Sequence, residues 1–100
     1  MQEAMNSHEH DEHIGRIYRH KTEHKKRLAF VDSELGSAVN LFRKAASQLE
    51  CVLGNERAEL TPALSQINID QVLRLVAERE QLKRRINDAN EELRRLGVRV

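Results

Sequence analysis

Apolar residues recur along the first half of the chain at alternating steps of three and four, the spacing of a coiled-coil seam. The register runs from Ile14 to Val52, and ten of its twelve positions are apolar. No proline interrupts it, and Gly54 follows as a helix stop. The pattern predicts one continuous helix over residues 7–53.

A shorter register of the same kind occupies the end of the chain, from Val72 to Leu96, and Arg79 is its one polar member. It predicts a second helix over residues 68–97, with Asp70 in the first turn, where the helix dipole favours negative charge. Residues 54–67, which contain the only proline, are predicted to connect the helices, with a short helical turn at the Thr61-Pro62 pair. Residues 1–6 are expected to be disordered, and 98–100 to form a tail.

About a dozen connecting residues favour an all-α antiparallel helical hairpin with coiled-coil packing. Pairing outward from the turn places Leu49 near Val72 and Leu28 near Leu93. Each alanine of the seam then meets a large side chain, as close packing requires. The predicted seam inside the hairpin consists of Leu28, Val31, Leu35, Ala38, Phe42, Ala45, Leu49, Val72, Leu75, Leu82, Ile86, Ala89 and Leu93.

The apolar positions are too numerous for one pair of helices to cover. Near the turn, apolar residues also occupy positions beside the seam. At the other end, residues 7–24 are expected to project past the shorter helix. A wide apolar face favours contact with more than one neighbour, so we expect self-association into a dimer or tetramer, most simply a four-helix bundle of two hairpins. In an alternative, the connection folds back over this surplus. The predicted oligomer interface consists of Ile14, Ile17, Tyr18, Val39, Leu41, Ala46, Leu53, Leu73 and Val76.

Composition narrows the class of protein. The chain is 39% hydrophobic and 33% charged, with only three aromatic residues, which favours helices over strands. Its longest apolar run, Leu28 to Val31, is far shorter than a membrane span, and its first residues lack a secretory signal pattern. Cys51 is the only cysteine, which fits a reducing compartment. The expected location is the cytoplasm, without membrane association.

Charge is strongly segregated although the net charge is only +1. Residues 16–27 hold six Lys and Arg against Glu23 alone. In the predicted hairpin these groups lie beside the basic end of the second helix, which suggests a surface for phosphates or an acidic protein. The alternative is that these charges solvate the exterior and pair with nearby glutamates. The candidate anion or nucleic-acid residues are Arg16, Arg19, Lys25, Lys26, Arg27, Arg94, Arg95 and Arg99.

Five histidines lie near the N-terminus. Two of them, His20 and His24, are one helical turn apart, the spacing at which two imidazoles share a metal ion. Three interpretations remain open: solvated side chains, a metal site, or a pH sensor in which protonated His24 loosens packing between chains. The candidate metal ligands are His8, His10, His13, His20 and His24.

No arrangement typical of catalysis is present. Ser33, Ser37, Ser47 and Cys51 have no histidine in register beside them, and there is no glycine-rich phosphate loop. The sequence therefore predicts a protein that is not an enzyme, with no cofactor and no small-molecule substrate. The expected function is that of a homo-oligomeric scaffold, adaptor or regulatory interaction protein that binds another protein. The alternatives are a nucleic-acid-binding accessory protein and a metal-binding or pH-responsive regulator.

Overall fold

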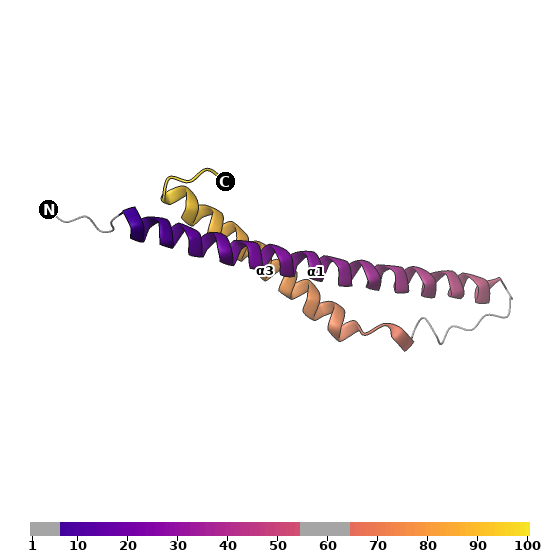
Figure 1. The fold of residues 1–100 in the computed structure, drawn as a ribbon. Coiled ribbons are helices and arrows are strands. Elements are labelled where there is room, and N and C mark those ends of the chain that lie inside the picture. The colour runs from indigo at the N-terminus through magenta and orange to yellow at the C-terminus, as the bar shows by residue number, and fades with distance from the viewer. Residues whose placement is uncertain (1–6, 55–64) are drawn as a thin grey trace. The chain divides into compact units, whose positions relative to one another are not determined.

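The computed structural model describes residues 7–54 and 65–100 of the chain. Two long helices pack against each other, α1 (Ser7–Leu53) and α3 (Ile69–Arg95), as Figure 1 shows. The all-α fold is confirmed, and so is the greater length of the first helix, with 47 residues against 27. The predicted disorder of 1–6, most of the predicted connection and its turn at Thr61-Pro62 lie outside the described residues.

The chain divides into two compact units, and each contains part of α1 and part of α3. The terminal unit comprises Met1–Ala29 with Glu80–Val100, and the central unit comprises Phe30–Arg79. Five hydrophobic side chains are buried among the residues that the structure describes. They are Val31, Ala45 and Leu75 in the central unit and Leu82 and Leu93 in the terminal unit.

In the terminal unit the helices run antiparallel. The Nε2 atom of His13 lies 3.4 Å from Oε1 of Glu92, and His24 lines one groove together with Arg85. Moving along α1 toward higher residue numbers therefore brings α3 residues of lower number alongside. The predicted projection of residues 7–24 is wrong for the residues from His13 onward, because these lie beside α3. The predicted pairing of Leu28 with Leu93 is also wrong.

The helices of the central unit also run antiparallel, because Ala38 and Leu41 of α1 line a groove with Leu75 and Val72 of α3. Arg79 donates a hydrogen bond from Nε to Oδ1 of Asp32 at 2.7 Å, which explains how an arginine fits a seam position. The predicted pairing places Arg79 beside Phe42, so this pair differs from the predicted register by ten residues, or nearly three helical turns. A shift by three whole turns keeps the same helix faces in contact. The apolar pattern alone therefore cannot distinguish the two registers.

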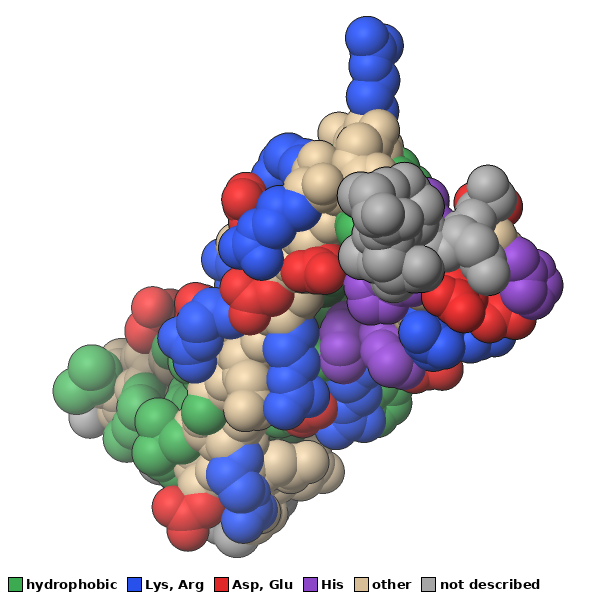
Figure 2. Space-filling model, turned by 90° about the vertical axis from the view of Figure 1, so that its left-hand side faces the viewer, with side chains coloured by type: hydrophobic (Ala, Val, Ile, Leu, Met, Phe, Trp, Pro, Cys, Tyr) green, Lys and Arg blue, Asp and Glu red, His purple; other side chains and the backbone are tan. Residues whose placement is uncertain are grey.

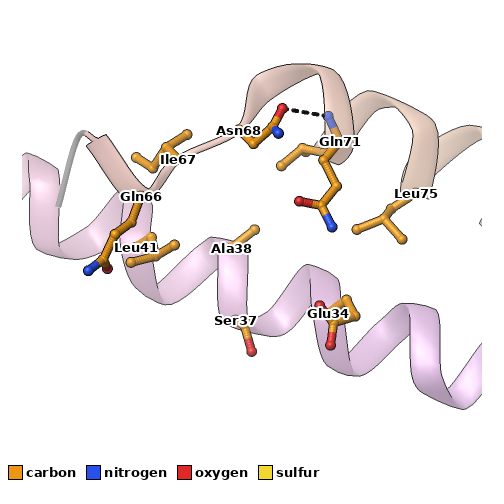
Figure 3. A pocket seen from close by; sticks show the side chains of 10 residues that line it. Glu34, Ser37, Ala38, Leu41, Gln66, Ile67, Asn68, Gln71 and Leu75 are labelled. Carbon is orange, nitrogen blue, oxygen red and sulfur yellow. Dashed lines mark hydrogen bonds between the residues drawn. The ribbon is translucent and has the colours of Figure 1, made fainter.

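The row of α1 residues that contacts α3 also differs in its details. Leu41 is half-buried and lines a groove with Val72 and Leu75, where Figure 3 shows it pointing toward that side together with Ala38. Phe42 and Leu49, both predicted in the seam, are 42% and 46% exposed. A straight α-helix drifts by about 20° per heptad from a strict 3.5-residue repeat. The α1 residues that face α3 consequently include Leu41 and Ala45, and we call Ala38, Leu41 and Ala45 the contact row of α1.

Asn68 caps the first turn of α3. Its Oδ1 atom accepts a hydrogen bond from the backbone N–H of Gln71 at 3.0 Å, and its carbonyl accepts one from Val72 at 3.1 Å. We expect Asn68→Ala to destabilise the protein by about 1 kcal/mol, because an N–H group of the first turn loses its acceptor. Asn68→Asp retains an acceptor and should unfold at the wild-type midpoint. Urea unfolding followed by far-UV circular dichroism checks both, and equal midpoints for wild type and Asn68→Ala would contradict the prediction.

Gly97 ends α3 in a left-handed conformation, with φ at 85°. The N–H of Val98 donates to the carbonyl of Leu93 at 2.9 Å, and the N–H of Gly97 donates to that of Arg94 at 3.0 Å, the pattern of a Schellman cap. A side chain at Gly97 is disfavoured by this φ, so Gly97→Ala should cost about 1 kcal/mol.

A matched glycine in a helix interior gives the opposite expectation. Gly36 lies within α1, and a Cβ atom there would meet nothing within 4 Å. Gly36→Ala should therefore raise stability by about 1 kcal/mol, since alanine favours the helical backbone. The two variants should shift the urea midpoint in opposite directions, and shifts of the same sign would contradict this account.

Candidate interaction surface

A stripe of apolar side chains follows α1 on the side next to its contact row. Val39, Phe42 and Leu49 are 45%, 42% and 46% exposed, Ala46 is exposed, and Leu53 is 85% exposed. Their spacing of three, four, three and four residues places all five on one face of the helix. That face lies roughly 100° around the helix from the contact row formed by Ala38, Leu41 and Ala45.

A second stripe occupies the first turns of α3. Ile69, Leu73 and Val76 are 52%, 61% and 44% exposed. On α3 the residues that face α1 are Val72, Leu75 and Arg79. The stripe lies roughly 90° around α3 from these residues, rotated in the same direction, toward higher residue numbers, as the stripe of α1 is from its own contact row. When two helices are antiparallel, stripes rotated by equal angles from their contact faces lie on the same side of the helix pair. The two stripes therefore face the same way.

A shallow groove joins the two stripes. The groove is lined from α1 by Phe42, Ala45, Ala46 and Leu49. From the other side it is lined by Ile69 at the start of α3 and by Ile67, which precedes that helix. All of these residues belong to the central unit. We call the combined surface the outer apolar surface, and it consists of Val39, Phe42, Ala46, Leu49, Leu53, Ile69, Leu73 and Val76.

The residues predicted at the oligomer interface fall into three groups. Five of them are exposed on the outer apolar surface, namely Val39, Ala46, Leu53, Leu73 and Val76. Leu41 faces α3, so its predicted place outside the hairpin seam is wrong.

Three further members of the predicted interface lie in the terminal unit. Ile14 and Ile17 are half-buried, and Ile17 lines a groove with residues of α3. Tyr18 is 40% exposed, and the Lys21 ammonium lies 5.8 Å from its ring centroid. Ile17 was predicted to need a second copy of the chain because it would have no neighbouring helix. Its contact with α3 supplies that neighbour within the same chain.

Most residues of the predicted hairpin seam are shielded. Eleven of the thirteen are buried or half-buried, and only Phe42 and Leu49 are exposed. Ile69, which completes the α3 stripe, was not among the predicted site residues. Its signal in the sequence is the spacing of four and three residues to Leu73 and Val76.

The predicted basic end of the hairpin has a different arrangement. Arg94 donates to Glu91 at 2.7 Å, and Arg95 donates to Glu92 at 3.4 Å. His24 lines a groove with Arg85, so the sequence neighbours of His24, residues 25–27, lie beside the middle of α3 rather than beside Arg94 and Arg95. Their predicted juxtaposition is wrong.

Other basic side chains of this unit are interleaved with acids. Arg16 and Arg19 share a surface depression with Glu12, while Lys26 shares another with Glu23. Arg99 is exposed after the end of α3. On the face drawn in Figure 2, Lys and Arg side chains alternate with Asp and Glu.

The histidines divide between local pairs and a groove of the terminal unit. His8 lies 2.9 Å from Glu12, one turn further along α1, and His10 is half-buried. His20 and His24 line a groove with Asp88 and Glu92 of α3. Among residues 7–54 and 65–100, no three His, Cys, Asp or Glu side chains converge on a point where they would hold a metal ion.

Neither helix of the described part of the chain has an apolar stretch long enough to cross a bilayer. Comparisons of the sequence with protein-family models and with curated proteins, and of the fold with solved structures, gave no match.

Proposed function

We propose that this protein is a non-enzymatic scaffold of the cytoplasm that works by self-association of its helical hairpin. The occupant of the outer apolar surface is the same surface of a second copy, and the product is a four-helix bundle built from two central units. The resulting dimer presents its two terminal units to other proteins. The observation that carries this proposal is the pair of apolar stripes on one side of α1 and α3.

The angular placement of the stripes supports a bundle of four helices. Each helix of such a bundle contacts two neighbours in directions about 90° apart. In the central unit, the contact row and the outer stripe of each helix have roughly that separation. The first direction is occupied by the other helix of the same chain, and the second is available to a second copy.

The extent and character of the surface agree with the requirements of a dimer. Seven of its eight residues are 42% to 85% exposed and Ala46 is also exposed, so the surface can contribute to an interface of the standard size, ~800 Å² per partner. All eight residues are apolar, which agrees with the general depletion of charged residues in the cores of protein interfaces. A two-fold dimer pairs one patch with itself, so an uncharged patch meets no like-charge repulsion.

Solution mass tests the proposal directly. Light scattering should give twice 11.6 kDa at submillimolar concentration and a lower average mass on dilution. A mass of 11.6 kDa throughout the accessible concentration range would overturn the proposal. The location is tested separately by fractionation of cells that express a tagged chain.

A nucleic-acid-binding function is the second candidate, and it rests on the charge of the terminal unit. That unit holds twelve Lys and Arg against nine Asp and Glu, a net of +3, together with all five histidines. Phosphate binding weakens steeply with salt, because bound counterions are released, whereas apolar helix packing does not. A gel shift of duplex DNA or RNA that disappears at raised salt would support this candidate, and no shift at low salt would exclude it.

A further inference from the structure

The apolar stripe of α1 is nearly symmetric about Ala46. Val39 and Leu53 lie seven residues before and after Ala46, while Phe42 lies four before it and Leu49 three after it. The order of apolar positions is therefore almost the same in both directions along the helix. A two-fold axis through Ala46 places one such stripe against another, with Val39 facing the partner's Leu53 and Phe42 facing the partner's Leu49.

Part of this stripe extends past the start of α3. Asp32 pairs with Arg79, and ten residues separate Arg79 from Ile69, the first residue of α3. Ten residues in the other direction, along α1 from Asp32, lead to Phe42, which lines a groove with Ile69. The half of the stripe that follows Phe42 consequently extends past the first residue of α3. It ends at Leu53, which is 85% exposed.

We propose that the two α1 helices of the dimer pack antiparallel and cross on a two-fold axis at Ala46. The crossing presupposes the proposed self-association and specifies its geometry. Leu49 and Leu53 of each copy then cover Phe42 and Val39 of the other. Because the distance between packed helices depends on the side chains at their contact, the small side chain of Ala46 on the axis lets the two helices approach closely.

A two-fold axis parallel to the helices covers less of the surface. That arrangement places each α1 over the partner's α3, because the rotation exchanges the two sides of the hairpin. Since α3 begins level with Phe42, Leu49 and Leu53 would then have no described helix opposite them. The crossing at Ala46 gives every side chain of the α1 stripe a neighbour from the second copy.

The crossing also accounts for the stripe of α3. Leu73 lies six residues before Arg79, so it is level with Ala38, next to Val39. Val39 faces the partner's Leu53, and an α1 helix inclined toward α3 brings that leucine to Leu73, which is 61% exposed. The partner's α1 thereby covers both stripes, and the two chains enter the shared core from opposite directions.

Disulfide formation between introduced cysteines tests the crossing in the full chain, with the native thiol removed by Cys51→Ser. Ala46→Cys should oxidise to a linked dimer, because the axis places its two sulfur atoms within disulfide distance. The matched control is Ser47→Cys, which follows directly but points roughly 100° further around the helix. It should crosslink at least ~10-fold more slowly than Ala46→Cys, since its sulfur atoms point away from the axis.

A mixture of two variants determines the direction of the helices. Val39→Cys and Leu53→Cys should form a mixed disulfide when they are combined. Neither should crosslink with itself, because the antiparallel crossing separates identical positions by about 21 Å along the helices. A tag on one of the two chains identifies the mixed dimer by its size on a non-reducing gel.

Ala46→Leu checks the axis without a crosslink. Ala46 is exposed in the single chain, so the hairpin accommodates a leucine there. In the dimer two leucines meet on the axis, and the dissociation constant measured by light scattering should rise at least ~10-fold. An unchanged dissociation constant would overturn the position of the axis.

Light scattering of the reduced chains separates the crossing from self-association itself. A monomeric wild type would overturn both. The crossing alone would be overturned by a dimeric wild type in which Val39→Cys links to itself rather than to Leu53→Cys. It would also be overturned if Ser47→Cys reacts as fast as Ala46→Cys, because random collision then explains the crosslinks.

Discussion

Leu73→Glu is expected to convert the proposed dimer into a helical monomer. Leu73 is 61% exposed in the single chain, so a glutamate there meets water and leaves the packing of α1 against α3 intact. In the proposed dimer the same carboxylate enters an apolar interface, and a two-fold axis places it there twice. Desolvation of each charge costs several kcal/mol, so the dissociation constant should rise by more than ~1000-fold. Light scattering should then give 11.6 kDa, and circular dichroism should retain the helical signal.

Ser47→Glu is the matched control for this experiment. Ser47 is exposed on α1 and follows Ala46 directly, but it points roughly 100° further around the helix, away from the outer apolar surface. The same new carboxylate at this position should leave the mass of the dimer unchanged. If Ser47→Glu dissociates the dimer as effectively as Leu73→Glu, general charge repulsion is the cause and the assigned surface is wrong. If Leu73→Glu remains dimeric, the second copy binds elsewhere.

Leu41 lies between the two helices of the hairpin rather than on the outer apolar surface. The sequence placed Leu41 outside the seam, which would have made Leu41→Glu the natural test of oligomerisation. In the structure it is half-buried beside Val72 and Leu75, so a glutamate there disrupts the hairpin itself. Loss of the dimer in that variant would not distinguish an interface residue from a core residue.

The sequence was sufficient for the helices and insufficient for their register. A three-four repeat of apolar residues specifies a helix and the face that it buries. Sliding one helix by about three turns along the other brings the same faces back into contact. The predicted pairing also matched each seam alanine with a large residue, so good packing did not reveal that the register was wrong. Polar contacts between particular residues distinguish the registers. The Asp32–Arg79 pair at 2.7 Å is one, and the contact of His13 with Glu92 is another.

The same limit applied to the candidate sites. The spacing of His20 and His24 was visible in the sequence, but the residues opposite them depend on the register. The predicted basic end failed for this reason, because residues 25–27 lie three turns away from their expected neighbours on α3. The outer apolar surface was predicted in part, since Val39, Leu73 and Val76 lie off the seam in either register. Phe42 and Leu49 were assigned to the seam because the drift of a straight helix was not considered.

Leu93→Ala is expected to have the largest effect on stability. Leu93 is 0% exposed and is one of the two largest side chains that are fully buried. Its carbonyl also accepts the hydrogen bond from Val98 that closes the Schellman cap. Truncation removes buried apolar surface and leaves a cavity, which together cost about 2–5 kcal/mol. With so few buried side chains to share the loss, the thermal midpoint should fall by more than ~10 °C.

Leu93→Met is the matched control, because methionine retains most of the volume and flexes to fill the site. It should cost less than ~1.5 kcal/mol. Thermal unfolding of both variants should be followed at one protein concentration, since the proposed dimerisation would make the midpoint depend on concentration. Midpoints within a few degrees of each other would mean that Leu93 is dispensable to the terminal unit. In that case the unit would have to be held by its polar contacts, which are exposed or half-buried and individually worth at most about 1 kcal/mol.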